Sequence, residues 1–255
     1  MGKAFKWLAV VTAVSALGAG AALYFALRPS SGVAYFTPKT VALTTDAQAS
    51  ARNGSPEILP ANVLLPVPYT DQAPFGNWAA RQHTCEEASL VMVDRYLAGD
   101  HSGSQIDAAS ADAAINRITP WKPAVDLTSE QVGEVATQHL GWSHEVLPAT
   151  RLNMQEQLAL GRPLIVGVRT HGLGNANYPG YWTHHEQPEW SVSHYLVVVG
   201  YDAQSFVLND PGITTGHGYH ITYDQLMHAI DDLDQAYPSL NSGRVILVLA
   251  PPANT

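Results

Sequence analysis

Cys85 is the only cysteine of the chain and the residue best suited to nucleophilic chemistry. It opens the segment 85–97, where apolar residues recur at helical spacing and acids occupy the first turn, so a helix is predicted to begin at Cys85. The unpaired amides and the dipole at a helix N-terminus favour a thiolate. A cysteine at such a place is more often a small buried side chain than a nucleophile, so its companions must decide.

Two further residues, His194 and Asp210, could activate Cys85 as a nucleophile. His194 begins an apolar run, and Asp210 ends the next one, 16 residues later. If the runs are neighbouring strands of a hairpin, the carboxylate can accept the ring N–H of His194. Such a pair stabilises imidazolium and can depress a partner thiol pKa to roughly 3–4. The order therefore predicts Cys85 as nucleophile, His194 as base and Asp210 as the group that orients the base.

The residues around Cys85 are less simple. Glu86 and Glu87 help a helix to start but repel a thiolate, so a low thiol pKa would depend on a cationic His194. Thr84 is a plausible N-cap. His83 is too close in sequence to align with the sulfur, and we expect it to face solvent or to cap locally.

Periodicity predicts an α+β domain with N-terminal helices packed on a C-terminal antiparallel β-sheet. We expect helices at 85–97, 107–117, 129–140 behind a Thr128–Gln131 capping box, 151–160 and 223–230. Strands are expected at 63–67, 163–168, 194–200, 206–208, 219–221 and 245–249.

Residues 7–27 form an apolar run of 21 residues without a charge, about the ~20 that cross a bilayer as a helix. Lys3 and Lys6 precede the run, which favours a cytoplasmic N-terminus and an extracytoplasmic domain. The alternative is a cleaved signal peptide, for which residues 19–21 offer small side chains. The expected organisation is an anchor or signal at 1–28, a flexible linker at 29–61 and one domain at 62–255.

Composition excludes several classes. The net charge of −9 opposes nucleic-acid binding. A single cysteine excludes an intramolecular disulfide, and no cysteine follows the apolar run to carry a lipid. His184, His185, His217 and His220 lack a metal-site spacing, so neither a metal nor another cofactor is expected.

Five segments carry a recognisable pattern in their order and spacing: Val67–Gln72, Cys85–Ser89, Gly161–Val166, Ser193–Tyr195 and Asn209–Pro211. Together they resemble the bacteriocin-processing (double-glycine leader) peptidases and their stand-alone relatives among the papain-like cysteine peptidases, and the likeness covers roughly 63–250. The resemblance implies a papain-like fold, here preceded by one transmembrane helix. It also implies that Gln72 donates to the oxyanion beside the Cys85 amide, although Gln82 competes for this role. The family's common Cys-Gly pair is Cys85-Glu86 here.

The leading hypothesis is a membrane-anchored extracytoplasmic cysteine peptidase that hydrolyses a peptide or protein substrate through a thioester. One alternative is an inactive papain-like module that binds peptide or cell wall, suggested by Glu86 and Glu87. Another keeps the chemistry but acts as a peptidoglycan amidase or acyl transferase. The aromatic-rich segment 171–190, directly before the base, either shapes the substrate cleft or packs on the domain.

Overall fold

The computed structural model describes residues 59–124, 126–173, 192–240 and 243–252. These residues belong to one compact unit, Leu43–Thr255. The apolar run 7–27, almost all of the linker 29–61 and residues 174–191, with His184 and His185, lie outside the described residues. Across the described ranges, no helix is both long and apolar enough to cross a membrane.

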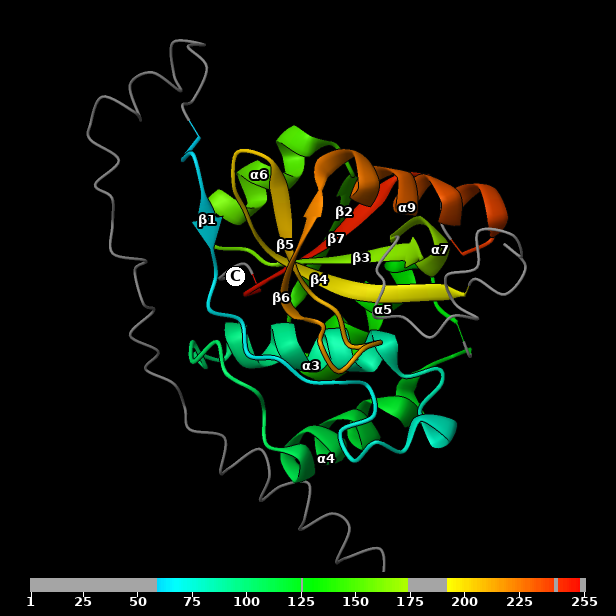
Figure 1. Ribbon diagram of the computed structural model, residues 1–255. Coiled ribbons are helices and arrows are strands. Elements are labelled where there is room, and N and C mark those ends of the chain that lie inside the picture. Colours follow the sequence, from blue (N-terminus) through cyan, green and yellow to red (C-terminus); the bar gives the residue numbers. More distant parts are fainter. Residues whose placement is uncertain (1–58, 125, 174–191, 241–242, 253–255) are drawn as a thin grey trace, which may run out of the picture. The chain divides into compact units, whose positions relative to one another are not determined.

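An antiparallel seven-stranded sheet forms the centre of the described unit (Figure 1). The strand order is β2-β7-β3-β4-β5-β6, and β1 pairs with β4 beyond the end of β3. The strands are β1 Val63–Leu64, β2 Ser143–Pro148, β3 Leu164–Arg169, β4 Ser193–Tyr201, β5 Ser205–Asn209, β6 His217–Thr222 and β7 Val245–Ala250.

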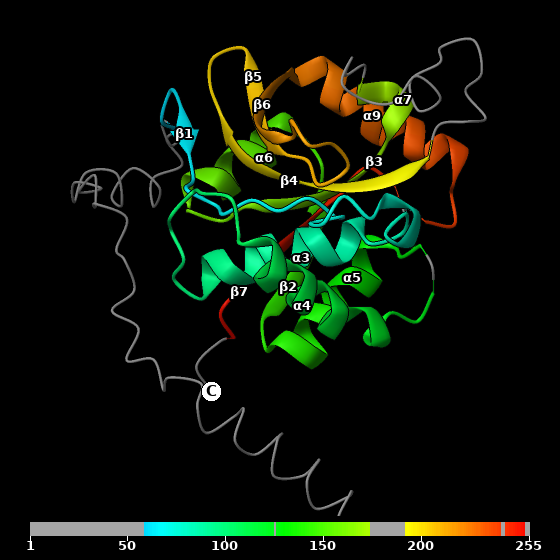
Figure 2. The same cartoon turned by 60° about the horizontal axis from the view of Figure 1, so that its bottom comes forward.

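Helices cover both faces of this sheet (Figures 1 and 2). One face carries α3 Cys85–Leu97, α4 Ala108–Ile118 and α5 Ser129–Val135, and the other carries α6 Arg151–Ala159, α7 Thr170–Leu173 and α9 Tyr223–Ala236. Short 3-10 turns lie at Trp78–Ala80 and Thr119–Trp121, and a π turn at Ala136–Leu140 extends α5.

The alternation of side chains along β4 explains why both faces need a cover. Tyr195 and Val197 join the apolar cluster under α3, whereas Leu196 and Val198 join the cluster under α9. Successive strand residues point to opposite faces, so an unbroken apolar run must be buried on two sides. The sheet is therefore the middle layer of a helix–sheet–helix arrangement.

The predicted α+β class with an antiparallel sheet is confirmed, and so is the Thr128–Gln131 capping box. The N-terminal helices pack on the sheet as expected, but α6, α7 and α9 form a second layer that the prediction lacked. Strand β2 was missed because none of its residues is fully buried, so it shows no apolar run. It forms by pairing along its whole length with β7, about a hundred residues later in the chain.

Candidate active site

Cys85 is the first residue of α3 and is 6% exposed. Thr84 occupies the N-cap position, as predicted, but its side chain does not cap the helix. Its hydroxyl donates instead to the carbonyl oxygens of Gln72 and Arg81, each at 3.1 Å. Thr84 therefore fastens the preceding loop to the start of the helix that carries the sulfur.

His194 and Asp210 form a buried pair. The Nε2 atom of His194 lies 2.7 Å from Oδ1 of Asp210, and both residues are almost fully buried. His194 is the second residue of β4, and Asp210 directly follows the adjacent strand β5. The hairpin geometry expected from the sequence thus brings the ring and the carboxylate together.

The loop after β5 fixes the carboxylate. Oδ1 of Asp210 also accepts the backbone N–H of Gly212 at 2.8 Å, and Oδ2 accepts the Tyr219 hydroxyl at 3.2 Å. The hydroxyl of Tyr69 lies 2.9 Å from the carbonyl oxygen of Asp210, and the Tyr69 ring stacks on His217. With its acceptor sites occupied and its loop held, the Asp210 carboxylate keeps one orientation toward the ring.

A series of contacts connects this pair to Cys85. The backbone N–H of Gln72 donates to the Pro211 carbonyl at 2.9 Å, and the Gln72 carbonyl accepts the Thr84 hydroxyl. On the other side, the backbone of Tyr195, the residue after His194, lies close enough to the Cys85 sulfur to lower its pKa. The segments that carry the four predicted site residues therefore meet in one place.

The two glutamines proposed for the oxyanion site differ in burial. Gln82 is exposed, whereas Gln72 is 1% exposed and donates from Nε2 to the Arg81 carbonyl at 2.6 Å. An amide nitrogen carries two hydrogens, so one remains for a second acceptor. Oε1 of Gln72 is buried and has no hydrogen-bond partner among the described residues. Burial and geometry both favour Gln72 over Gln82.

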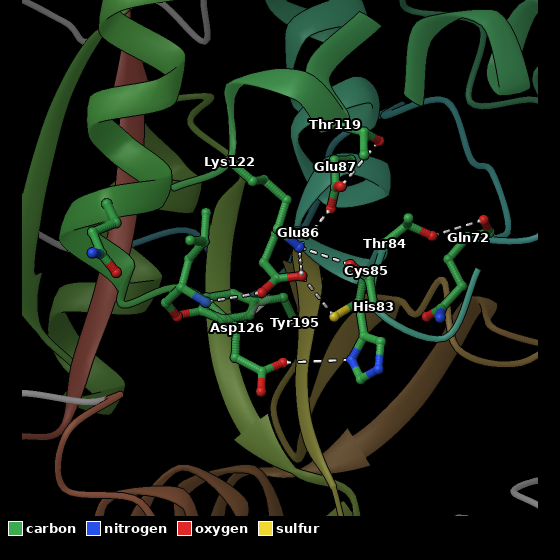
Figure 3. A network of polar contacts seen from close by, with 12 residues as sticks. Gln72, His83, Thr84, Cys85, Glu86, Glu87, Thr119, Lys122, Asp126 and Tyr195 are labelled. Carbon is green, nitrogen blue, oxygen red and sulfur yellow. Dashed lines mark hydrogen bonds and ion pairs between the residues drawn. The ribbon is translucent and has the colours of Figure 1, made fainter. Parts of the chain in front are cut away.

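The environment of the thiol differs from the expectation of a low pKa. The sulfur donates to Oε2 of Glu86 at 3.2 Å (Figure 3). Burial, then the charge of Glu86 and this hydrogen bond, raise the pKa of Cys85 well above its ordinary value. Lys122 and the Tyr195 backbone act in the opposite direction but do not prevail. In this arrangement Cys85 is a thiol, and the stabilisation of a thiolate by the helix N-terminus is outweighed.

Lys122 is the site residue that sequence reasoning missed. Its ammonium group lies 3.2 Å from Oε2 of Glu86 and 3.1 Å from Oε2 of Glu87, and it donates to the His83 carbonyl at 2.7 Å (Figure 3). Both glutamates are 1% exposed, so the acids predicted in the first turn of the helix belong to a buried ion-paired cluster. No pattern at Lys122 signals this, because its partners lie 35 or more residues earlier.

The pKa directions in this cluster follow from one cation serving two carboxylates. Burial raises the pKa of Glu87 in spite of its ion pair. Burial lowers the pKa of Lys122, but Glu86 and Glu87 together reverse this, so the Lys122 pKa is raised. One ammonium therefore lies at ion-pair distance from two buried carboxyl groups beside the thiol, and it can neutralise only one of them.

The remaining histidines have other contacts. The side chain of His83 is 59% exposed and lies 3.8 Å from Asp126, which confirms that it faces solvent. His217 stacks on Tyr69, and His220 lies 2.8 Å from the Ser205 hydroxyl and 3.3 Å from Asp202. Within the described ranges, no group of three or more His, Cys, Asp or Glu side chains is arranged to hold a metal ion.

Comparison with known proteins gives a family match and structural neighbours. The profile of the Peptidase_C39 like family matches residues 64–242. A protein described as a C39-like peptidase from Bacillus anthracis is 14% identical, with a TM-score of 0.49, and the match covers 76% of this chain and 99% of that one. Xylellain, a cysteine protease from Xylella fastidiosa, is also 14% identical, with a TM-score of 0.33 and coverage of 76% and 87%. No curated protein matches the chain.

Proposed function

Since this chain belongs to the Peptidase_C39 like family, we propose that it is a cysteine peptidase whose nucleophile is Cys85, whose base is His194 and whose orienting acid is Asp210. The observation that carries the proposal is the buried 2.7 Å contact between His194 and Asp210. Hydrogen bonds through Pro211 and Gln72 link this pair to Thr84, the residue before Cys85. A buried His–Asp pair of this kind is costly to maintain without a use.

The contact between His194 and Asp210 supports one arrangement of the protons. Because Asp210 accepts the proton on Nε2 of His194, Nδ1 is the ring atom that takes the proton from the sulfur. The S–H bond breaks, its electron pair stays on sulfur, and sulfur attacks the substrate carbonyl carbon to form a tetrahedral intermediate. His194 returns the proton to the amine nitrogen as the C–N bond breaks, which leaves the thioester, and water then hydrolyses the thioester to release the acid product and regenerate the thiol. Gln72 and the Cys85 backbone amide would donate to the oxyanion.

Peptide hydrolysis by the full chain and by Cys85→Ala tests this proposal. We expect Cys85→Ala to remove hydrolysis while the protein stays folded, and Asp210→Asn to lower turnover by roughly 10²–10⁴-fold because the amide can orient the ring but cannot stabilise its charge. Hydrolysis that survives in Cys85→Ala would refute the assignment. Product analysis on peptides and on cell-wall fragments separates a peptidase from an amidase or acyl transferase.

One observation favours a second candidate, an inactive module that binds peptide or cell wall. The thiol is buried and donates to Glu86, which is the arrangement of a structural cysteine. If iodoacetamide modifies Cys85 only after unfolding, whatever the pH, this candidate replaces the enzyme. Modification of the folded protein at a pH where the thiol ionises supports the enzyme.

We further propose that residues 7–27 anchor the protein in the cell membrane with its domain on the extracytoplasmic side. The charge-free apolar run and the preceding Lys3 and Lys6 support this proposal. The full chain should fractionate with membranes, and deletion of residues 1–28 should release a soluble domain. If the protein expressed from the full sequence is found entirely in the soluble fraction, with its N-terminus near Ala22, the cleaved signal peptide is favoured.

A further inference from the structure

Glu86 contacts the Cys85 sulfur but has no role in the proposed triad. Its Oε2 atom accepts the Cys85 thiol at 3.2 Å and the Lys122 ammonium at 3.2 Å, while Oε1 accepts the backbone N–H of Leu127 at 3.2 Å (Figure 3). Both oxygens are therefore occupied, and the residue is 1% exposed. A carboxylate held in this way has one position and cannot turn away from the sulfur without losing three partners.

Leu127 ties this carboxylate to the strand that carries the proposed base. Its N–H donates to Glu86, and its carbonyl oxygen accepts the Tyr195 hydroxyl at 2.9 Å. Tyr195 follows His194, and its backbone lies near enough to the sulfur to lower the pKa of the thiol. The sulfur thus lies between a fixed carboxylate on α3 and the strand of the proposed base.

The charges around the sulfur decide its protonation. Helix α3 contributes Glu86 and Glu87, and the segment after α4 contributes Lys122. Strand β4 contributes Tyr195 and His194, and His194 is paired with Asp210. Asp126 lies near Tyr195 and His83. One ammonium faces two buried carboxylates, so ionisation of the thiol would add a second uncompensated negative charge. Like charges at contact distance disfavour ionisation, and a dry environment strengthens this effect.

We propose that Glu86, fixed by Lys122 and the Leu127 amide, is a positioning residue that holds the Cys85 thiol protonated and sets the pH at which it becomes reactive. This inference rests on Cys85 as the nucleophile of the proposed function. It goes further by giving the pair Cys85-Glu86 a role: Glu86 keeps the nucleophile neutral in the resting protein, and Lys122 limits the strength of that effect.

The test is the pH dependence of Cys85 alkylation by iodoacetamide in the full-length chain, where Cys85 is the only cysteine and no other thiol contributes. In the wild-type protein the midpoint should lie above 9.0, the ordinary value. Glu86→Gln should lower the midpoint by roughly 1–3 pH units, and Lys122→Met should raise it. The acid limb of the kcat/KM profile should move with the midpoint.

Glu87→Gln is the matched control, because Glu87 is the neighbouring buried glutamate and is also ion-paired with Lys122. Among the described contacts, Glu87 has no hydrogen bond to the Cys85 sulfur. Its midpoint should move less than that of Glu86→Gln. Equal shifts in the two variants, or an unchanged midpoint in Glu86→Gln, would overturn the inference. Should Glu86→Gln not fold, a wild-type midpoint below 9.0 or a downward shift in Lys122→Met would overturn it instead.

The two proposals fail in different ways. If hydrolysis survives in Cys85→Ala, the proposed function is refuted, but the alkylation midpoints still test the effect of Glu86 on the thiol. If the alkylation midpoint does not shift in Glu86→Gln while hydrolysis still depends on Cys85, the inference is refuted and the proposed function is not.

Discussion

At the scale of single residues, Gly212 determines how closely the loop after β5 can approach the base. A Cβ atom built on Gly212 would lie 2.8 Å from Cε1 and 2.9 Å from Nε2 of His194, and 3.2 Å from Oδ1 of Asp210. Carbon atoms do not approach other atoms this closely, so a side chain here must displace the ring or the loop. The absence of a side chain is what permits the 2.7 Å contact within the pair.

Gly212→Ala is therefore expected to lower kcat/KM by about 10²-fold or more, because displacing a base by about 1 Å can cost this much. Gly218→Ala is the matched control, since no atom lies within 4 Å of its Cβ but its φ of +68° strains any other residue. The control should lose some thermal stability and keep its turnover. Similar losses of turnover in both variants would point to general damage to the loop.

The sequence identifies Cys85, His194 and Asp210 as candidates because each lies at the end of a recognisable element, and strand pairing then brings His194 and Asp210 together. Lys122 could not be found in this way. Its position depends on how the segment after α4 folds back over the start of α3, which no local pattern encodes. For the same reason, the direction of the Cys85 pKa shift follows from the folded cluster, whereas the sequence left open whether the helix N-terminus or the two glutamates would determine it.

At the scale of elements, the second helical layer depends on α9. The helix contributes Tyr223, Leu226, Ala229 and Ile230 to the apolar cluster on this face of the sheet, and it packs against β3. Sequence periodicity located the start of this helix but ended it at 230, whereas it extends to Ala236. Three aspartates and a glutamine in the last turns hid the apolar stripe, because only Leu233 continues it there.

Leu226→Ala should destabilise the protein by about 2–5 kcal/mol, since the side chain is fully buried and its removal leaves a cavity in this layer. Leu152→Ala in α6 is the control, because that leucine is 57% exposed, and it should change stability by less than about 0.5 kcal/mol. Urea denaturation of both variants measures the difference. Equal effects would mean that the layer over β3 packs differently from the arrangement described.

At the scale of the whole molecule, several buried groups favour their protonated forms together. Burial, and for Cys85 also Glu86, raises the pKa of Cys85, Tyr69 and Tyr195 above their ordinary values. The carboxylates around Lys122 raise its pKa as well, against the effect of burial. In the unfolded chain these groups would lose protons at about their ordinary values, 9.0 for the thiol, 10.0 for the tyrosines and 10.5 for the lysine. The folded protein holds these protons to higher pH.

The sign of the resulting pH dependence is fixed by proton binding. Above about pH 9 the folded state binds more protons than the unfolded state, so the free energy of unfolding falls as pH rises. We expect the stability that these groups contribute to be fully present below that pH and to be lost progressively between about pH 9 and about pH 11, measured by urea denaturation at constant ionic strength. Cys85→Ala removes the contribution that begins at 9.0, so its decline should start later, near the ordinary value of 10.0 for the tyrosines. A stability that does not change across this range would mean that these groups are exposed to solvent in the folded protein. An identical decline in Cys85→Ala would show that the thiol already ionises at its ordinary pKa when the chain is folded.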